Sequence, residues 1–118
     1  MTDRETYAPL VLFEYDHRPG SYCLMLGDSH MGAVEDVFAE CGHEAGGYGW
    51  EGVARSAVRE RAPELAGRFG YDCEAGMFVA YGEDPDALGR LGALLHRAFG
   101  DRALLKELIL AADPDWFD

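Results

Sequence analysis

The stretch LVLFEYDHRPGSYCLML, residues 10–26, decides the fold of the first part of the chain. Its two β-prone runs flank a tetrapeptide in which Pro19 precedes Gly20. This pair favours a type II turn, because glycine tolerates the positive φ that the third turn position requires. The pattern therefore predicts a β-hairpin. The stretch FGYDCEAGMFVAYG at residues 69–82 has the same character and predicts a second hairpin.

Four helices are expected, two after each hairpin, because apolar residues recur there at spacings of three and four. We expect Asp28 or Ser29 to cap the first helix and Gly42 to end it. Asp84 is the expected cap of the third helix, which Pro85 opens. The four apolar stripes cover residues 31–41, 50–58, 88–99 and 104–109.

The alternation of hairpins and helix pairs predicts an α+β fold, in which the two hairpins build one antiparallel sheet within a single domain of residues 1–118. A shift of 56 residues places Tyr15 on Tyr71 and Asp16 on Asp72, so we interpret the chain as an internal ββαα duplication. Both alternating faces of the strands are apolar. We therefore expect helices, or a partner, to cover more than one side of the sheet.

Composition indicates a soluble globular protein. The chain has 118 residues, of which 48% are hydrophobic and 27% charged, and this length can bury a core without metal or disulfide support. Neither a secretory signal nor an apolar run of membrane-spanning length is visible. Cys23, Cys41 and Cys73 are odd in number and lack C-x-x-C spacing, which favours reduced thiols and a cytoplasmic location.

The charge balance restricts the class of partner. The chain carries 22 Asp and Glu against 10 Lys and Arg, a formal net charge of -12 at pH 7. Such a chain repels nucleic acid and anionic membranes, so we expect neither as a partner, and a cationic partner is the natural complement. The competing interpretation is that the negative charge only keeps a small protein soluble.

The stretch GGYGWEG at residues 46–52 contains the G-x-G-x-x-G spacing of dinucleotide-binding loops. That fingerprint needs a strand directly before it, whereas a predicted helix and a loop precede it here. Glu44 and Glu51 also flank the glycines and would repel a phosphate. We predict no nucleotide cofactor and interpret the glycines as a sharp turn between two helices, with Trp50 as the apolar anchor of the second.

No catalytic or metal-binding set is recognisable in the sequence. Cys41 and His43 lie close together, but no second pair at ligand spacing accompanies them, and a zinc site needs at least three protein ligands. Ser29 is adjacent to His30 without the G-x-S-x-G motif of a nucleophile elbow. We therefore predict no metal, no cofactor and no enzyme activity, which leaves protein binding as the expected role.

The ordered segments FEYD…GSYCLML, GGYGWEGVARSAV, APEL and FGYDCEAGMFVAYG resemble the immunity protein 51 family of bacterial polymorphic toxin systems. The resemblance runs from Leu10 to Ile109, and its most specific pieces are residues 47–50 and 74–78. It implies a small α+β protein without enzyme activity. It also implies that the protein binds and neutralises a cognate toxin domain.

The resemblance carries no toxin-contact residues, so the candidates come from this chain's own charge and aromatic side chains. Glu40, Glu44 and Glu51 flank the predicted turn between helices, and Tyr48 is a residue type favoured at interface hot spots. We predict that these four residues bind a cationic toxin domain, with the chain itself a monomer or a homodimer. Two alternatives are a small-molecule sensor with a cleft between the two halves and a structural homodimer.

Overall fold

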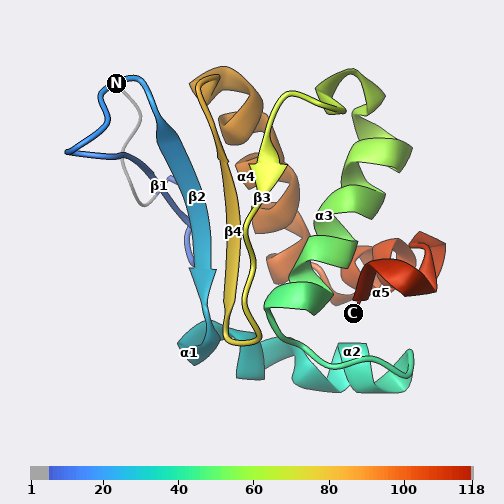
Figure 1. Cartoon of the computed structure of the whole chain (residues 1–118). Helices are drawn as coiled ribbons and strands as arrows, with labels where there is room; N and C mark the ends of the chain where they lie inside the picture. The colour runs from blue at the N-terminus through green and yellow to red at the C-terminus, as the bar shows by residue number, and fades with distance from the viewer. Residues whose placement is uncertain (1–5, 118) are drawn as a thin grey trace.

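The computed structural model describes residues 6–117, which form a four-stranded antiparallel sheet with helices packed on it (Figure 1). The two predicted hairpins lie in this one sheet, so the predicted α+β class is confirmed. The strands are β1 (Val11–Glu14), β2 (Tyr22–Gly27), β3 (Gly70–Tyr71) and β4 (Met77–Gly82), in the order β1-β2-β4-β3.

The first hairpin closes as its sequence predicts. Gly20 has a φ of 88°, and the N–H of Ser21 donates to the carbonyl of Arg18 at 3.0 Å, which is the hydrogen bond of a four-residue turn. The carboxylate of Glu14 accepts a further hydrogen bond from the N–H of Gly20 at 2.8 Å. The turn therefore holds β1 and β2 in the register that pairs Leu12 with Leu24.

The predicted duplication is visible in the inner strands only. Leu24 of β2 lies opposite Ala80 of β4, and these two residues are equivalent under the 56-residue shift. This register relates β2 and β4 by a local two-fold axis. The outer strands do not follow it, because Leu24 pairs with Leu12 whereas Ala80 pairs with Tyr71.

The first predicted helix is broken into pieces, which corrects the continuous helix expected from its apolar stripe. The pieces are α1 (Asp28–Met31), a 3-10 turn (Gly32–Val34) and α2 (Glu35–Glu40). The expected cap was also wrong: the N-cap is Gly27, which makes no side-chain hydrogen bond, and Asp28 already lies inside α1. Because β2 runs directly into α1, no loop residue separates them to act as a cap.

The remaining helices follow the sequence signals more closely. They are α3 (Gly47–Arg61), α4 (Pro85–Gly100) and α5 (Arg102–Ala111), with 3-10 turns at Pro63–Leu65 and Pro114–Phe117. Asp84 caps α4 as predicted, since its carboxylate accepts from the N–H of Ala87 at 3.1 Å. Gly42, with a φ of 81°, follows the end of α2. No helix among residues 6–117 is both long and apolar enough to cross a membrane.

The core lies between one face of the sheet and the helices. The sheet contributes alternate residues of β1, β2 and β4, and Trp50 of α3 is fully buried between the rings of Phe38 and Phe99. The hydroxyl of Ser56 donates to the carbonyl of Leu108 at 2.7 Å and joins α3 to α5. The buried residues on this face of the sheet are Leu12, Leu24, Leu26, Phe78 and Ala80, whereas Cys23 of β2 is buried on the other face.

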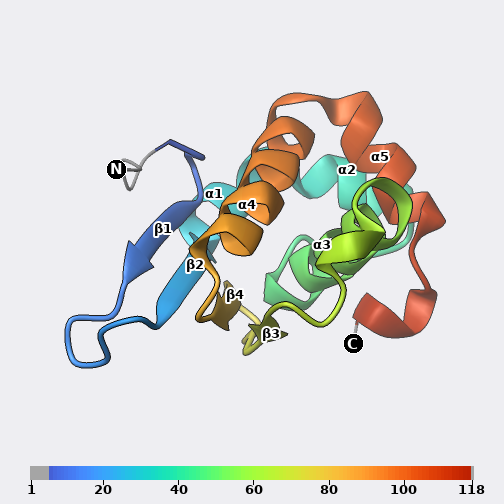
Figure 2. The ribbon, with the colours of Figure 1, turned by 90° about the horizontal axis from the view of Figure 1, so that it is seen from above.

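All the helices that pack on the sheet lie on the same side of it, as the view from above shows (Figure 2). We expected cover on more than one side because both strand faces are apolar. For residues 6–117 the helical part of that expectation is wrong, since α3 and α4 cover a single face. The opposite face is available to a partner.

Candidate functional site

The glycines of residues 46–52 are packing positions at the start of α3. The N–H of Gly47 donates to the carbonyl of Ala75 at 2.9 Å, and a Cβ on Gly47 would overlap the carbonyl oxygens of Glu74 and Met77. A Cβ on Gly52 would lie 2.8 Å from the ring of Phe117. The glycines therefore allow the helix to approach the β3–β4 turn and the C-terminal segment closely.

This placement corrects the interpretation of the stretch as a sharp turn. Gly47, Gly49 and Gly52 lie within α3, and the only described glycines with positive φ are at positions 20, 42 and 67. The chain reverses at Gly42 instead. What precedes α3 is α2 and a loop, so the strand that begins a dinucleotide-binding turn is replaced by a helix.

The four predicted contact residues have different surroundings. Glu40 ends α2 and lies 3.7 Å from Nζ of Lys106 on α5, whereas Glu51 pairs with Arg55 at 2.8 Å and lies beside Cys73. Glu44 is exposed, and Tyr48 in the first turn of α3 is 40% exposed. Two of the three carboxylates thus already have a cation.

The other sequence candidates are occupied by packing. The ring of His43 stacks on Phe117 with centroids 3.9 Å apart. Burial raises the pKa of the Cys73 thiol to about 12 and raises the pKa of Cys23 as well, so both are protonated and unreactive at neutral pH. Within residues 6–117, no three His, Cys, Asp or Glu side chains gather as metal ligands would.

Ion pairs are concentrated on the helical layer. The described part of the chain has seven of them, and they use seven of the ten Lys and Arg residues. Six join side chains of the helices and the 3-10 turn after α3, and the seventh joins Arg68 to Asp84 at the start of α4. The four strands contain no Lys or Arg. The cations nearest to the strands lie in the flanking segments, with Arg18 in the β1–β2 turn and Arg68 before β3.

The face of the sheet that points away from α3 and α4 is apolar, and we call it the open face. Its central row pairs Val11, Met25 and Val79 across three strands, and each of these side chains is half-buried. Met77 and Tyr81 on β4 are 37% and 45% exposed. The open face consists of Val11, Phe13, Cys23, Met25, Met77, Val79 and Tyr81. The alternation of apolar residues on both faces was the sequence signal for this surface.

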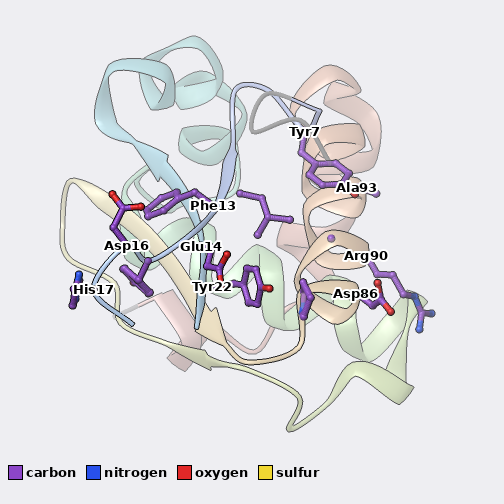
Figure 3. Close-up of a pocket in the computed structure, with 13 residues that line it drawn as sticks. Tyr7, Phe13, Glu14, Asp16, His17, Tyr22, Asp86, Arg90 and Ala93 are labelled. Carbon is purple, nitrogen blue, oxygen red and sulfur yellow. The ribbon is translucent and has the colours of Figure 1, made fainter. Parts of the chain in front are cut away.

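A groove of about 1370 Å³ lies between the first hairpin and α4. Figure 3 shows Asp86 and Arg90 on the α4 side and Phe13, Asp16 and His17 on the hairpin side. Its carboxylates are exposed. Small-molecule sites commonly contain buried titratable groups with shifted pKa values, and the carboxylates of this groove are not buried.

Residues 10–114 match the sequence model of the immunity protein 51 family. The chain belongs to this family. The resemblance inferred from the glycine-aromatic segments is thereby confirmed, and the family is one of immunity proteins. No curated protein matches the chain, and no solved structure does. The contact surface of this immunity protein must therefore be argued from its own residues.

Proposed function

We propose that this immunity protein protects its own cell by binding and neutralising a cognate toxin domain of a polymorphic toxin system that neighbouring cells deliver. The observation that carries the proposal is the charge balance: the net charge is -12, and seven of the ten Lys and Arg residues are already held in ion pairs within the described residues. Such a surface attracts a basic protein and raises its association rate.

The proposed partner is a toxin domain with a basic face, such as one that acts on nucleic acid and binds phosphates with Lys and Arg. An acidic inhibitor covers that face and blocks access to the substrate. Inhibition of this kind needs contact and no chemistry, so we propose a binding protein without catalysis. It acts in the cytoplasm as a single domain, either as a monomer or as a homodimer.

The four predicted contact residues contribute unequally in this proposal. Glu44 and Tyr48 are exposed, and neither forms an ion pair within the described residues. They are therefore the best contacts of the set. Glu40 and Glu51 already pair with Lys106 and Arg55, and these cations offset much of their charge, so they contribute less to the attraction of a cationic partner.

Charge reversal tests the proposal with a matched control. The variant Glu40→Lys, Glu44→Lys, Glu51→Lys and the control Glu60→Lys, Glu64→Lys, Glu107→Lys change net charge equally. The probe is the C-terminal toxin domain encoded by the neighbouring gene, and binding is followed by stopped flow at several salt concentrations. We expect the first variant to associate about tenfold more slowly at low salt than the control, with a flatter salt dependence.

Co-expression supplies the functional readout. Wild-type chain is expected to restore growth of cells that produce the active toxin domain, and the control variant is expected to do so equally well. A wild-type chain that neither binds the toxin domain nor restores growth would refute the proposed function. Full protection by both variants with equal association rates would refute the role of the residues 40–51.

A further inference from the structure

Building on the proposed neutralisation of a toxin, we propose that the open face of the sheet is the surface that receives the toxin's basic face. No described helix covers the open face of the sheet. Proteins of this size seldom leave a contiguous apolar surface of several strands in water without a partner. The proposal assigns this surface to the toxin domain and not to a second copy of the chain.

Exposed large apolar side chains gather at this face. Among residues 6–117 there are four, and Met77 and Tyr81 belong to the open face itself. A third, Tyr48, directly follows Gly47. Gly47 packs against the carbonyl groups of Glu74 and Met77, at the start of β4. Leu110 on α5 is the fourth and lies in the helical layer. The open face and the start of α3 thus supply the aromatic and methionine residues typical of interface centres.

Carboxylates lie around the open face, in excess over the nearby cation Arg18 of the β1–β2 turn. Asp72 is bound to β4 through its N–H, which donates to the carbonyl of Val79. The pKa of the neighbouring Tyr15 is raised mainly by its hydrogen bond with Cys23, and the charge of Asp72 adds to this effect. Asp28 lies against Gly76 in the β3–β4 turn. Asp16, Glu74 and Glu83 are exposed in the neighbouring turns. None of these five carboxylates has an ion-pair partner within the described residues.

This charge pattern selects the occupant. A second copy of the chain would bring an identical set of carboxylates against the first, and like charges at an interface oppose association. A basic protein places Lys and Arg opposite the carboxylates and apolar side chains opposite the centre. The open face is therefore complementary to a cationic toxin surface with an apolar centre.

The side chains of the face are held in place before binding. The ring of Tyr81 lies over Gly70, within 2.7 Å of where a Cβ would stand, and Tyr15 is fixed by a hydrogen bond to Cys23. Residues on paired strands lose little conformational freedom when a partner docks, which favours tight binding. Gly70 thus has a role in the surface, since any larger residue would displace Tyr81.

Methionine methyl NMR tests the proposal on the wild-type chain. Met25 and Met77 lie on the open face, while Met31 is 2% exposed in the core and serves as an internal control. The probe is a catalytically inactive form of the toxin domain encoded by the neighbouring gene. We expect the Met25 and Met77 methyl signals to shift or broaden at one equivalent, while the Met31 signal stays in place.

Two variants add an energetic test. The double variant Met77→Lys, Tyr81→Lys is expected to weaken toxin binding about 30-fold or more, whereas Leu110→Lys, at the exposed position on the helical layer, changes it by about twofold or less. Thermal melts establish that both variants fold. The single variant Met77→Lys replaces the double variant if Tyr81 proves necessary for stability.

The outcomes separate the two proposals. Tight toxin binding with unchanged Met25 and Met77 signals would overturn the open-face assignment and leave the immunity function standing. Shifts of the same two signals when the chain alone is concentrated would identify a second copy as the occupant and overturn it as well. Absence of any toxin binding by the wild-type chain would refute the immunity function, and the open-face assignment with it.

Discussion

Replacement of Gly47 by alanine tests whether the glycine-aromatic segment is a packing device. In an exposed helix this substitution stabilises a protein by about 0.5–1 kcal/mol, because alanine loses less backbone entropy on folding. At position 47 the new Cβ would lie 2.7 Å from the carbonyl carbon of Met77 and would overlap the oxygens of Met77 and Glu74. These are backbone atoms of a turn, so no side chain can rotate away.

The expected loss of stability has two contributions, because the start of α3 and the β3–β4 turn must move apart to admit the new Cβ. Overpacking of this kind costs about 1–3 kcal/mol, and the hydrogen bond from the N–H of Gly47 to the carbonyl of Ala75 contributes about 1 kcal/mol more. Gly47→Ala is therefore expected to lower the free energy of unfolding by about 2–4 kcal/mol.

Gly32→Ala is the matched control. Gly32 lies between α1 and α2 with helical φ and ψ of -60° and -26°, and no atom lies within 4 Å of where its Cβ would stand. This variant is expected to be about 0.4–1 kcal/mol more stable than wild type. Urea unfolding followed by tryptophan fluorescence measures both values. A Gly47→Ala variant as stable as the Gly32→Ala control would refute the close-packing explanation of this segment.

Three further perturbations have expected outcomes. Trp50→Ala is expected to lower the free energy of unfolding in urea by about 3–5 kcal/mol. The loss should lie toward the lower end of this range, because the buried indole N–H has no hydrogen-bond partner within residues 6–117. A loss below about 1 kcal/mol would contradict a core role for Trp50. Ser56→Ala removes the hydrogen bond from the Ser56 hydroxyl to the carbonyl of Leu108. It should lower the free energy of unfolding by only about 1 kcal/mol, because this carbonyl still accepts a hydrogen bond from the N–H of Ala112. An unchanged unfolding midpoint would show that the Ser56 hydrogen bond does not contribute to stability. The hydrogen bond from the N–H of Ala87 lowers the pKa of Asp84 below its usual value of 3.8. Asp84→Ala should therefore lower the melting temperature at pH 7, and its difference from wild type should fade as the pH falls below 3.8 and the carboxylate is protonated. A difference in melting temperature that does not depend on pH would exclude the carboxylate as its cause.

The local signals in the sequence determined the elements of the fold. Pro19 and Gly20 close a hairpin, and Asp84 caps α4, because each of these effects acts within a few residues. The prediction of one continuous helix over residues 31–41 failed. The apolar stripe from Met31 to Cys41 is continuous in sequence, but α1 begins directly after β2 and a 3-10 turn divides the helix. Family membership was also readable from the glycine-aromatic segments.

The roles of the candidate site residues were decided only by the tertiary structure. Gly47 resembled a turn or a phosphate loop until the β3–β4 turn, which is distant in sequence, was seen to pack against it. Likewise, Glu40 looked like a free carboxylate, and only the fold places Lys106 near it, whereas the pair of Glu51 with Arg55 spans one helical turn and follows from their spacing in the sequence. The apolar alternation of the strands predicted two faces to be covered, but the packing of α3 and α4 determines which face remains open. Contacts between distant segments set these features, and a single sequence carries no local signal for such contacts.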